Sequence, residues 1–203
     1  MTAPATFPRP PARTQRFTLG DPRTVTVSPD GQRVVFARSS RGDDPVNALW
    51  VLDVDPADGP VPAPRLVADP HELLGVADDA DLPEAERRRR ERMREGAAGV
   101  TGYACDGSVR TAAFTLSGRL FVADLLAGVG AGARELHVEG PVFDPVPDPA
   151  GSQIAYVCGS TLRVAALDGT SRLVAGEPGH TDATSTISWG SAEFVAAEEM
   201  GRH

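Results

Sequence analysis

Residues 24–38 read TVTVSPDGQRVVFAR, and this stretch decides the fold. Two runs rich in β-branched residues flank a Ser-Pro-Asp-Gly sequence, which is typical of a tight turn. Apolar and polar residues alternate in these runs, as they do in a strand with one buried face. The runs NALWVLDV at 47–54 and PRLVAD at 64–69 follow, so the sequence predicts four strands joined by short connections.

The same order of strands and turns returns along the chain. A second copy has predicted strands at 100–105, 111–116, 119–124 and 134–138. A third copy begins at Val142 and has predicted strands at 153–158, 161–167 and 171–175. A fourth copy is predicted from strands at 186–190 and 193–197. Such internal repetition is the sequence mark of repeat architectures.

The aromatic residue of each second strand gives the length of the repeat. Phe114 and Tyr156 are 42 residues apart, and Tyr156 and Phe194 are 38 apart. A four-stranded repeat of about 40 residues is the spacing of β-propeller blades. Phe36 lies 78 residues before Phe114, so an insertion of nearly blade length separates the first two copies.

The predicted fold class is therefore all-β, an incomplete β-propeller of about three and a half four-stranded blades with one inserted α-helix. The propeller portion covers 16–203, and the proline-rich segment 1–15 is predicted to be disordered. A single blade has two faces that both need cover, and a closed ring takes at least about four blades. We therefore expect this chain to be a fragment of a longer protein.

The inserted helix is predicted at 83–95. Pro83 suits a first helical turn and Gly96 suits the end of a helix. Its arginines could form a patch for nucleic acid or membrane. The glutamates between them favour a solvated helix with salt bridges instead.

The composition limits the expected binding partners and the expected cellular location. The formal net charge is -8, so nucleic acid is not an expected partner. All 20 basic residues are arginine, which is typical of a GC-rich bacterial genome. Residues 1–20 contain no apolar run of the kind found in a secretory signal, and no later run is long enough to span a membrane. The expected location is the cytoplasm.

The sequence predicts no metal site, no cofactor site and no catalytic triad. Cys105 and Cys158 are predicted to be buried free thiols rather than a disulfide, and they lack metal-ligand spacing. The four histidines have no second ligand at metal-binding spacing. A Gly-x-Ser-x-Gly nucleophile sequence is absent from the chain, so any hydrolase triad would come from elsewhere.

Glu198 and Glu199 form the leading candidate for a binding site. Two adjacent carboxylates at the end of an apolar strand turn at least one side chain toward the sheet face. That position is unfavourable unless a cation compensates the charge, and a free α-amino group is such a cation. The spacing alone also fits a solvated loop after the strand.

Residues 189–203, WGSAEFVAAEEMGRH, resemble a signature of bacterial dipeptidyl peptidase IV-type enzymes of the prolyl oligopeptidase clan of serine peptidases. The predicted helix and the following residues 96–103 are similar to another segment of these enzymes. The resemblance implies an N-terminal eight-bladed propeller over a C-terminal α/β-hydrolase domain. It implies that Glu198 and Glu199 bind the free α-amino group of a peptide substrate. It also implies that Arg94 or Arg92 holds the carbonyl of the substrate's second residue.

The same resemblance places the catalytic Ser, Asp and His in the hydrolase domain, which this chain lacks. Enzyme activity of this polypeptide is therefore open. Its expected partners are a peptide with a free N-terminus, that hydrolase domain, and a second copy in a homodimer. Two alternatives remain: a propeller-type protein-binding module without an enzymatic role, and an endo-acting or acyl-peptide hydrolase of the same clan.

Overall fold

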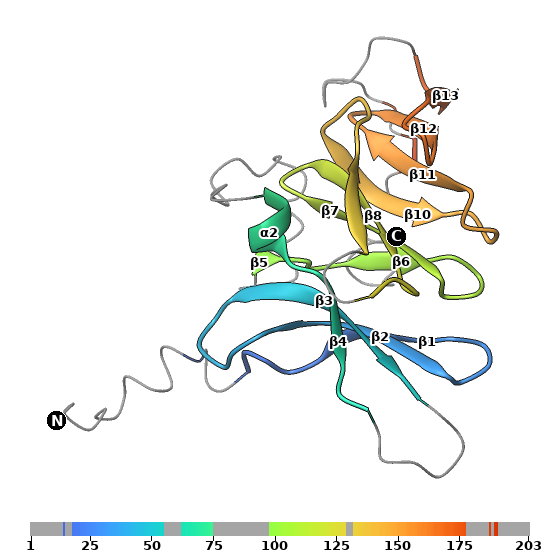
Figure 1. Ribbon diagram of the computed structural model, residues 1–203. Helices are drawn as coiled ribbons and strands as arrows, with labels where there is room; N and C mark the ends of the chain where they lie inside the picture. The colour runs from blue at the N-terminus through green and yellow to red at the C-terminus, as the bar shows by residue number, and fades with distance from the viewer. Residues whose placement is uncertain are drawn as a thin grey trace, which may run out of the picture.

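The computed structural model describes residues 14, 18–54, 62–74, 98–128, 132–177, 187 and 189–190. Within these residues the chain is mostly β and forms three antiparallel sheets in sequence order (Figure 1). Figure 1 shows the sheets one above another, with the blue sheet lowest, the green and yellow sheet in the middle and the orange sheet on top. This confirms an all-β chain built from successive small sheets.

The first sheet has the strand order β1-β2-β3-β4. Its antiparallel strands are β1 (Arg23–Val27), β2 (Arg33–Ser39), β3 (Val46–Asp53) and β4 (Arg65–Ala68). A two-residue strand, β5 (Ala98–Gly99), adds a parallel pairing to β3. The sheet therefore holds the four predicted strands and one short addition.

The second and third sheets repeat this order. The second consists of β6 (Tyr103–Cys105), β7 (Thr111–Leu116), β8 (Arg119–Asp124) and β9 (Ala133–Leu136). The third consists of β10 (Val142–Pro147), β11 (Gln153–Cys158), β12 (Thr161–Ala166) and β13 (Ser171–Ala175). Each sheet joins its strands in chain order, as a propeller blade does.

One predicted strand, 100–105, is wrong in its first half. The chain pairs with the first sheet at Ala98–Gly99 and joins the second sheet only from Tyr103. Gly99 has a φ of 75°, and a Cβ there would lie 2.4 Å from the Asn47 carbonyl oxygen. This close approach requires glycine and turns the chain from one sheet to the next.

The first strand of the other two sheets is interrupted at the same place. The register shifts between Arg23 and Thr26 in β1, and between Phe143 and Val146 in β10. Such bulges bend a strand and increase its local twist. A bulge depends on pairing with the neighbouring strand, so alternation along one strand does not reveal it.

The helix α2 (Pro70–Leu74) was not among the predicted elements. Asp69 starts it by accepting hydrogen bonds from the N–H of His71 at its side chain and of Leu73 at its carbonyl. Five residues are too few to show a helical period in the sequence. The predicted helix at 83–95 and the segment 1–15 lie outside the described residues. So does the fourth copy, apart from Ile187, Trp189 and Gly190, which are not in a strand.

Two apolar cores lie between the sheets. The first joins side chains of the first and second sheets, and includes Leu49, Val51 and Phe114. The second joins the second and third sheets, and includes Leu120 and Tyr156. Each sheet thus buries a face against the next, which is the packing of consecutive propeller blades.

The predicted repeat is also confirmed in the connection between the first two strands. Counted back from Phe36, Phe114 and Tyr156, residues Ser28, Asp106 and Asp148 occupy equivalent positions. In each sheet this residue's side chain accepts a hydrogen bond from the N–H that opens the second strand, at 2.9, 2.6 and 2.9 Å. All three connections lie on the same side of the molecule (Figure 1).

Candidate functional site

The predicted substrate-binding residues Glu198, Glu199, Arg92 and Arg94 lie outside the described residues. Gly190, the last described residue, lies on the third sheet, where a Cβ would be 2.9 Å from Val157 and 3.0 Å from Leu162. The N–H of Trp189 donates to the Ser160 carbonyl at 3.0 Å. Trp189 and Gly190 therefore contact the third sheet, and Gly190 lies eight residues before Glu198 in the chain.

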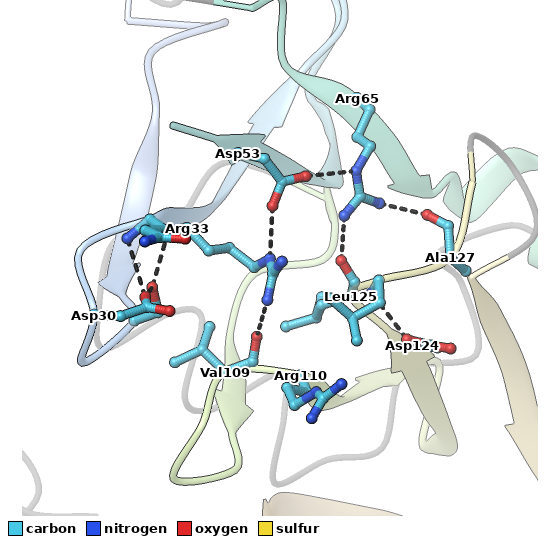
Figure 2. Close-up of polar contacts among 12 residues, drawn as sticks. Asp30, Arg33, Asp53, Arg65, Val109, Arg110, Asp124, Leu125 and Ala127 are labelled. Carbon is cyan, nitrogen blue, oxygen red and sulfur yellow. Dashed lines mark hydrogen bonds and ion pairs between the residues drawn. The ribbon is translucent and has the colours of Figure 1, made fainter. Parts of the chain in front are cut away.

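A polar cluster between the first two sheets is the most elaborate group of charges in the described part (Figure 2). Asp53, at the end of β3, accepts hydrogen bonds from Arg33 Nε at 2.8 Å and from Arg65 Nε at 3.1 Å. Both arginine side chains are about four-fifths buried, with 18% and 19% exposed. One carboxylate thus sets the direction of two guanidinium groups.

Both arginines reach across to the second sheet. Arg33 donates to the Val109 carbonyl at 3.3 Å. Arg65 donates to the Ala127 carbonyl at 2.6 Å and also to the Leu125 carbonyl. All these acceptors are main-chain oxygens, so the cluster connects two sheets and presents no free catalytic group (Figure 2).

The same connection recurs between the second and third sheets. Arg134 in β9 donates to the Leu167 carbonyl at 2.7 Å. Arg65 and Arg134 occupy equivalent positions. Arg65 pairs with Val51 in the third strand of the first sheet, and Arg134 pairs with Val122 in the third strand of the second sheet. We call this pair, with its acceptors, the inter-sheet arginine contact.

Sequence reasoning missed this contact, although a signal was present. The tetrapeptide Arg-Leu-Val-Ala occurs twice, at 65–68 and at 172–175. Both copies form the fourth strand of a sheet. A search for identical words at equivalent strand positions would have found Arg65 and Arg172, but not Arg134, whose strand reads Ala-Arg-Glu-Leu.

Asp106 is the most heavily hydrogen-bonded carboxylate of the described residues. It accepts from the Ser108 N–H and hydroxyl, and from the N–H groups of Arg110 and Thr111. Burial alone would raise the pKa of Asp106, but these hydrogen bonds outweigh it and hold the pKa below the ordinary 3.8. Its charge therefore stabilises the connection rather than a ligand.

This lowered pKa predicts an acid-sensitive stability. In the unfolded chain Asp106 takes up a proton near pH 3.8, before the folded chain does. The stabilisation is therefore complete above that pH and is lost as the pH falls through the folded-state pKa. We expect Asp106→Asn to flatten the fall in unfolding free energy below about pH 4, measured by urea unfolding at several pH values. Parallel curves for the two proteins would contradict the assignment.

The two cysteines are free thiols, as the sequence predicts. Cys158 is buried, whereas Cys105 is only partly buried. Burial raises the pKa of the Cys105 thiol to about 12 and also raises the pKa of Cys158. A thiol of this kind is a poor nucleophile and a poor metal ligand at neutral pH.

This predicts slow modification of both thiols in the folded protein. At pH 8 we expect a thiol reagent such as DTNB to react with neither cysteine on the timescale of minutes, because little thiolate forms. Both should react at once in denaturant, which provides the control for reagent and thiol content. Rapid reaction of one thiol without denaturant would show that its environment is not the apolar one described.

Metal and membrane features are absent from the part of the chain that the structure describes. Among those residues, no group of three His, Cys, Asp or Glu side chains is arranged to hold a metal ion. None of the helices described there is long and apolar enough to cross a membrane.

Comparisons with known proteins give distant structural similarities only. No family model matches the chain. A TolB protein from Agrobacterium tumefaciens is 14% identical with a TM-score of 0.45, over 78% of this chain and 49% of that chain. TolB from Acinetobacter baumannii is 14% identical with a TM-score of 0.43, over 76% of this chain and 31% of that chain. The chain thus spans half or less of the length of these structures.

Proposed function

We propose that the chain is the N-terminal propeller portion of a dipeptidyl peptidase IV-like serine exopeptidase. Its acidic pair would bind the free amino group of the peptide substrate. The observation that carries the proposal is the order of the chain: three blade-like sheets precede the Glu-Glu sequence, and residues 189–203 resemble the anchor segment of that family. The proposed location is the cytoplasm.

The chemistry of the acidic pair fits this role. A substrate ammonium group offers three donors, and two carboxylates can accept them as charge-assisted hydrogen bonds. Each such bond contributes about 1.5–3 kcal/mol. Only a peptide with a free N-terminus supplies that cation, so the pair would select exopeptidase substrates and fix how far the chain enters.

The reaction itself would take place in the α/β-hydrolase domain of the complete protein. A serine activated by histidine would attack the carbonyl of the substrate's second residue and form an acyl-enzyme, which water then hydrolyses. Arg92 or Arg94 would hold that carbonyl through the planar fork of its guanidinium group. The described sheets contribute the frame on which the anchor segment begins.

The test uses the protein encoded by the complete reading frame and a dipeptide anilide with a free amino group. We expect Glu198→Gln and Glu199→Gln each to raise KM by roughly tenfold or more, because one charge-assisted contact is lost. The value of kcat should change less, since the anchor lies away from the reacting bond. Glu193→Gln is the matched control in the same segment and should leave KM unchanged.

Two results would contradict the proposal and favour an alternative function. Equal cleavage of amino-blocked and free peptides would favour an endo-acting or acyl-peptide hydrolase of the same clan. A reading frame without any hydrolase domain would favour the protein-binding module. The observation that favours a protein-binding module is the exposure of three apolar side chains on the first and third sheets: Val25, Val27 and Val174.

A further inference from the structure

Val109 adopts a backbone conformation for which the other two sheets use glycine. Counted back from Phe114, it is equivalent to Gly31 in the first sheet and to Gly151 in the third. The φ angles of Gly31, Val109 and Gly151 are 72°, 54° and 68°. Each N–H donates to the carbonyl of the residue three positions before it, at 2.9, 3.1 and 2.9 Å. A β-branched residue is strained in this left-handed region, so the valine stands at a position that favours glycine.

The surroundings of the three turns differ. A Cβ at Gly31 would meet no other atom within 4 Å. A Cβ at Gly151 would lie 3.0 Å from the Thr111 hydroxyl oxygen, which leaves little room for a valine. The Val109 side chain is 4% exposed and belongs to the first core, between the first and second sheets. Burial against the first sheet therefore offsets the strain of the turn at Val109.

The same turn presents a hydrogen-bond acceptor to the first sheet. Arg33 donates to the Val109 carbonyl at 3.3 Å, and Asp53 holds the Arg33 guanidinium group at 2.8 Å (Figure 2). The direction of a carbonyl follows from the backbone angles of the residues beside it. A Val109 that left the left-handed region would therefore turn this acceptor away from Arg33. Both the side chain and the carbonyl of Val109 depend on the packed first sheet.

The hydrogen bonds of Asp106 depend on this turn as well. The Asp106 carboxylate accepts from the N–H groups of Ser108, Arg110 and Thr111 at 3.1, 2.7 and 2.6 Å. These donors lie on both sides of Val109 in the chain, so a change in the Val109 backbone angles would move them apart. The turn therefore connects the packing of the first sheet to the hydrogen bonds at the start of β7.

We propose that Val109 is a latch residue, which makes separation of the first and second sheets and loss of the Asp106 hydrogen bonds a single transition. The packed first sheet covers the Val109 side chain and binds its carbonyl, and so keeps the left-handed turn. When the sheets separate, nothing offsets the strain, and the turn relaxes. The equivalent turn at Gly151 carries no such strain, because glycine adopts this conformation freely. This inference does not rest on the proposed peptidase function.

The two native thiols report the separation of the sheets. Cys105 packs against the first core and Cys158 lies in the second core, so labelling of each thiol by DTNB requires the sheets around that core to separate. Amide exchange of Arg110 and Thr111, followed by NMR under the same conditions, reports the Asp106 hydrogen bonds. In the 203-residue chain we expect the protection of these amides to agree with that of Cys105 within about threefold, because one opening exposes both. A difference of more than about tenfold would overturn the proposal.

Val109→Gly should uncouple the two events. Glycine keeps the left-handed turn without help from the first sheet, so the amides of Arg110 and Thr111 should become at least about tenfold better protected than the Cys105 thiol. Val109→Asn gives the same comparison if the glycine variant is too unstable, because asparagine also tolerates this conformation. Amides that are no better protected than the thiol in the folded variant would overturn the proposal.

Matched arginine variants test the coupling from the side of the first sheet. Arg33→Gln removes a contact that exists only while the sheets are packed. It should speed Cys105 labelling and the exchange of the two amides by the same factor, about tenfold, and leave Cys158 labelling unchanged. Arg134→Gln removes a contact between the second and third sheets and should speed the labelling of Cys158 alone. Unchanged exchange of the two amides in Arg33→Gln would overturn the proposal, whatever the labelling rate of Cys105.

Discussion

Replacing Phe114 with alanine is expected to destabilise the chain by about 3–5 kcal/mol, the usual cost of removing a large buried aromatic side chain. Phe114 is fully buried in the first core, and its ring stacks on Phe121 with centres 5.7 Å apart. The cavity would open at the middle of the inter-sheet packing, where neither sheet can close it alone. Urea unfolding followed by circular dichroism measures the loss.

A matched variant shows whether the cost comes from the sheet-to-sheet contact. Phe36 is the equivalent residue of the first sheet, but its outer side faces Arg38 at 5.8 Å instead of another sheet. We expect Phe36→Ala to cost clearly less than Phe114→Ala. Phe114→Leu, which keeps most of the volume, should cost less than either and keeps the comparison measurable if the alanine variant does not fold. Equal costs at both positions would argue against the described packing.

Replacing Asp106 with alanine is the second large expected effect, at about 2–4 kcal/mol. Its carboxylate accepts from four donors, and the residue is only 5% exposed. Alanine leaves three main-chain N–H groups of a partly buried connection without an acceptor, which costs more than the loss of an ordinary hydrogen bond. Thermal unfolding monitored by circular dichroism measures the effect.

The control is the same substitution in the third sheet. Asp148 makes the same cap, but its hydrogen bonds to Ser152 and Gln153 are solvent-exposed, so water can replace the lost acceptor. We expect Asp148→Ala to cost about 1 kcal/mol, as an exposed cap does. A larger loss at Asp148 than at Asp106 would mean that burial does not set the cost.

The sequence predicted the sheets well because each strand carries its own local signal. The strands 111–116, 119–124, 153–158 and 171–175 were predicted with the bounds that the structure gives. All four are short runs of mostly apolar residues that end at or near a glycine or an aspartate. Because these signals are local, they do not depend on how the sheets pack.

Features that depend on contacts between sheets could not be predicted in this way. The bulge in β10 and the turn at Gly99 arise from pairing with neighbouring strands. Arg65 looked like an ordinary polar residue at a strand end, and only the carbonyl oxygens of the second sheet give it a role. Asp106 lies between the predicted strands 100–105 and 111–116, but the number of its hydrogen-bond donors is visible only in the folded connection.

Sequence and structure contribute different parts of the account of the candidate site. Glu198 and Glu199 were identified by a resemblance of short sequence, and they lie outside the described residues. What the described residues contribute is the position of Trp189, whose N–H donates to the Ser160 carbonyl of the third sheet nine residues before Glu198. The acidic pair therefore stays a prediction, which the KM measurement with glutamine variants tests.

The central claim is that consecutive sheets cover one another: among the described residues, the middle sheet packs against another sheet on both faces, and the first and third sheets do so on one. Hydrogen exchange of the dilute chain, followed by mass spectrometry of peptides, tests it most directly. We expect β7 and β8 to exchange slowest and β1 and β13 fastest, because exchange follows local opening. Slower exchange in β1 or β13 than in β7 and β8 would contradict the stacked arrangement.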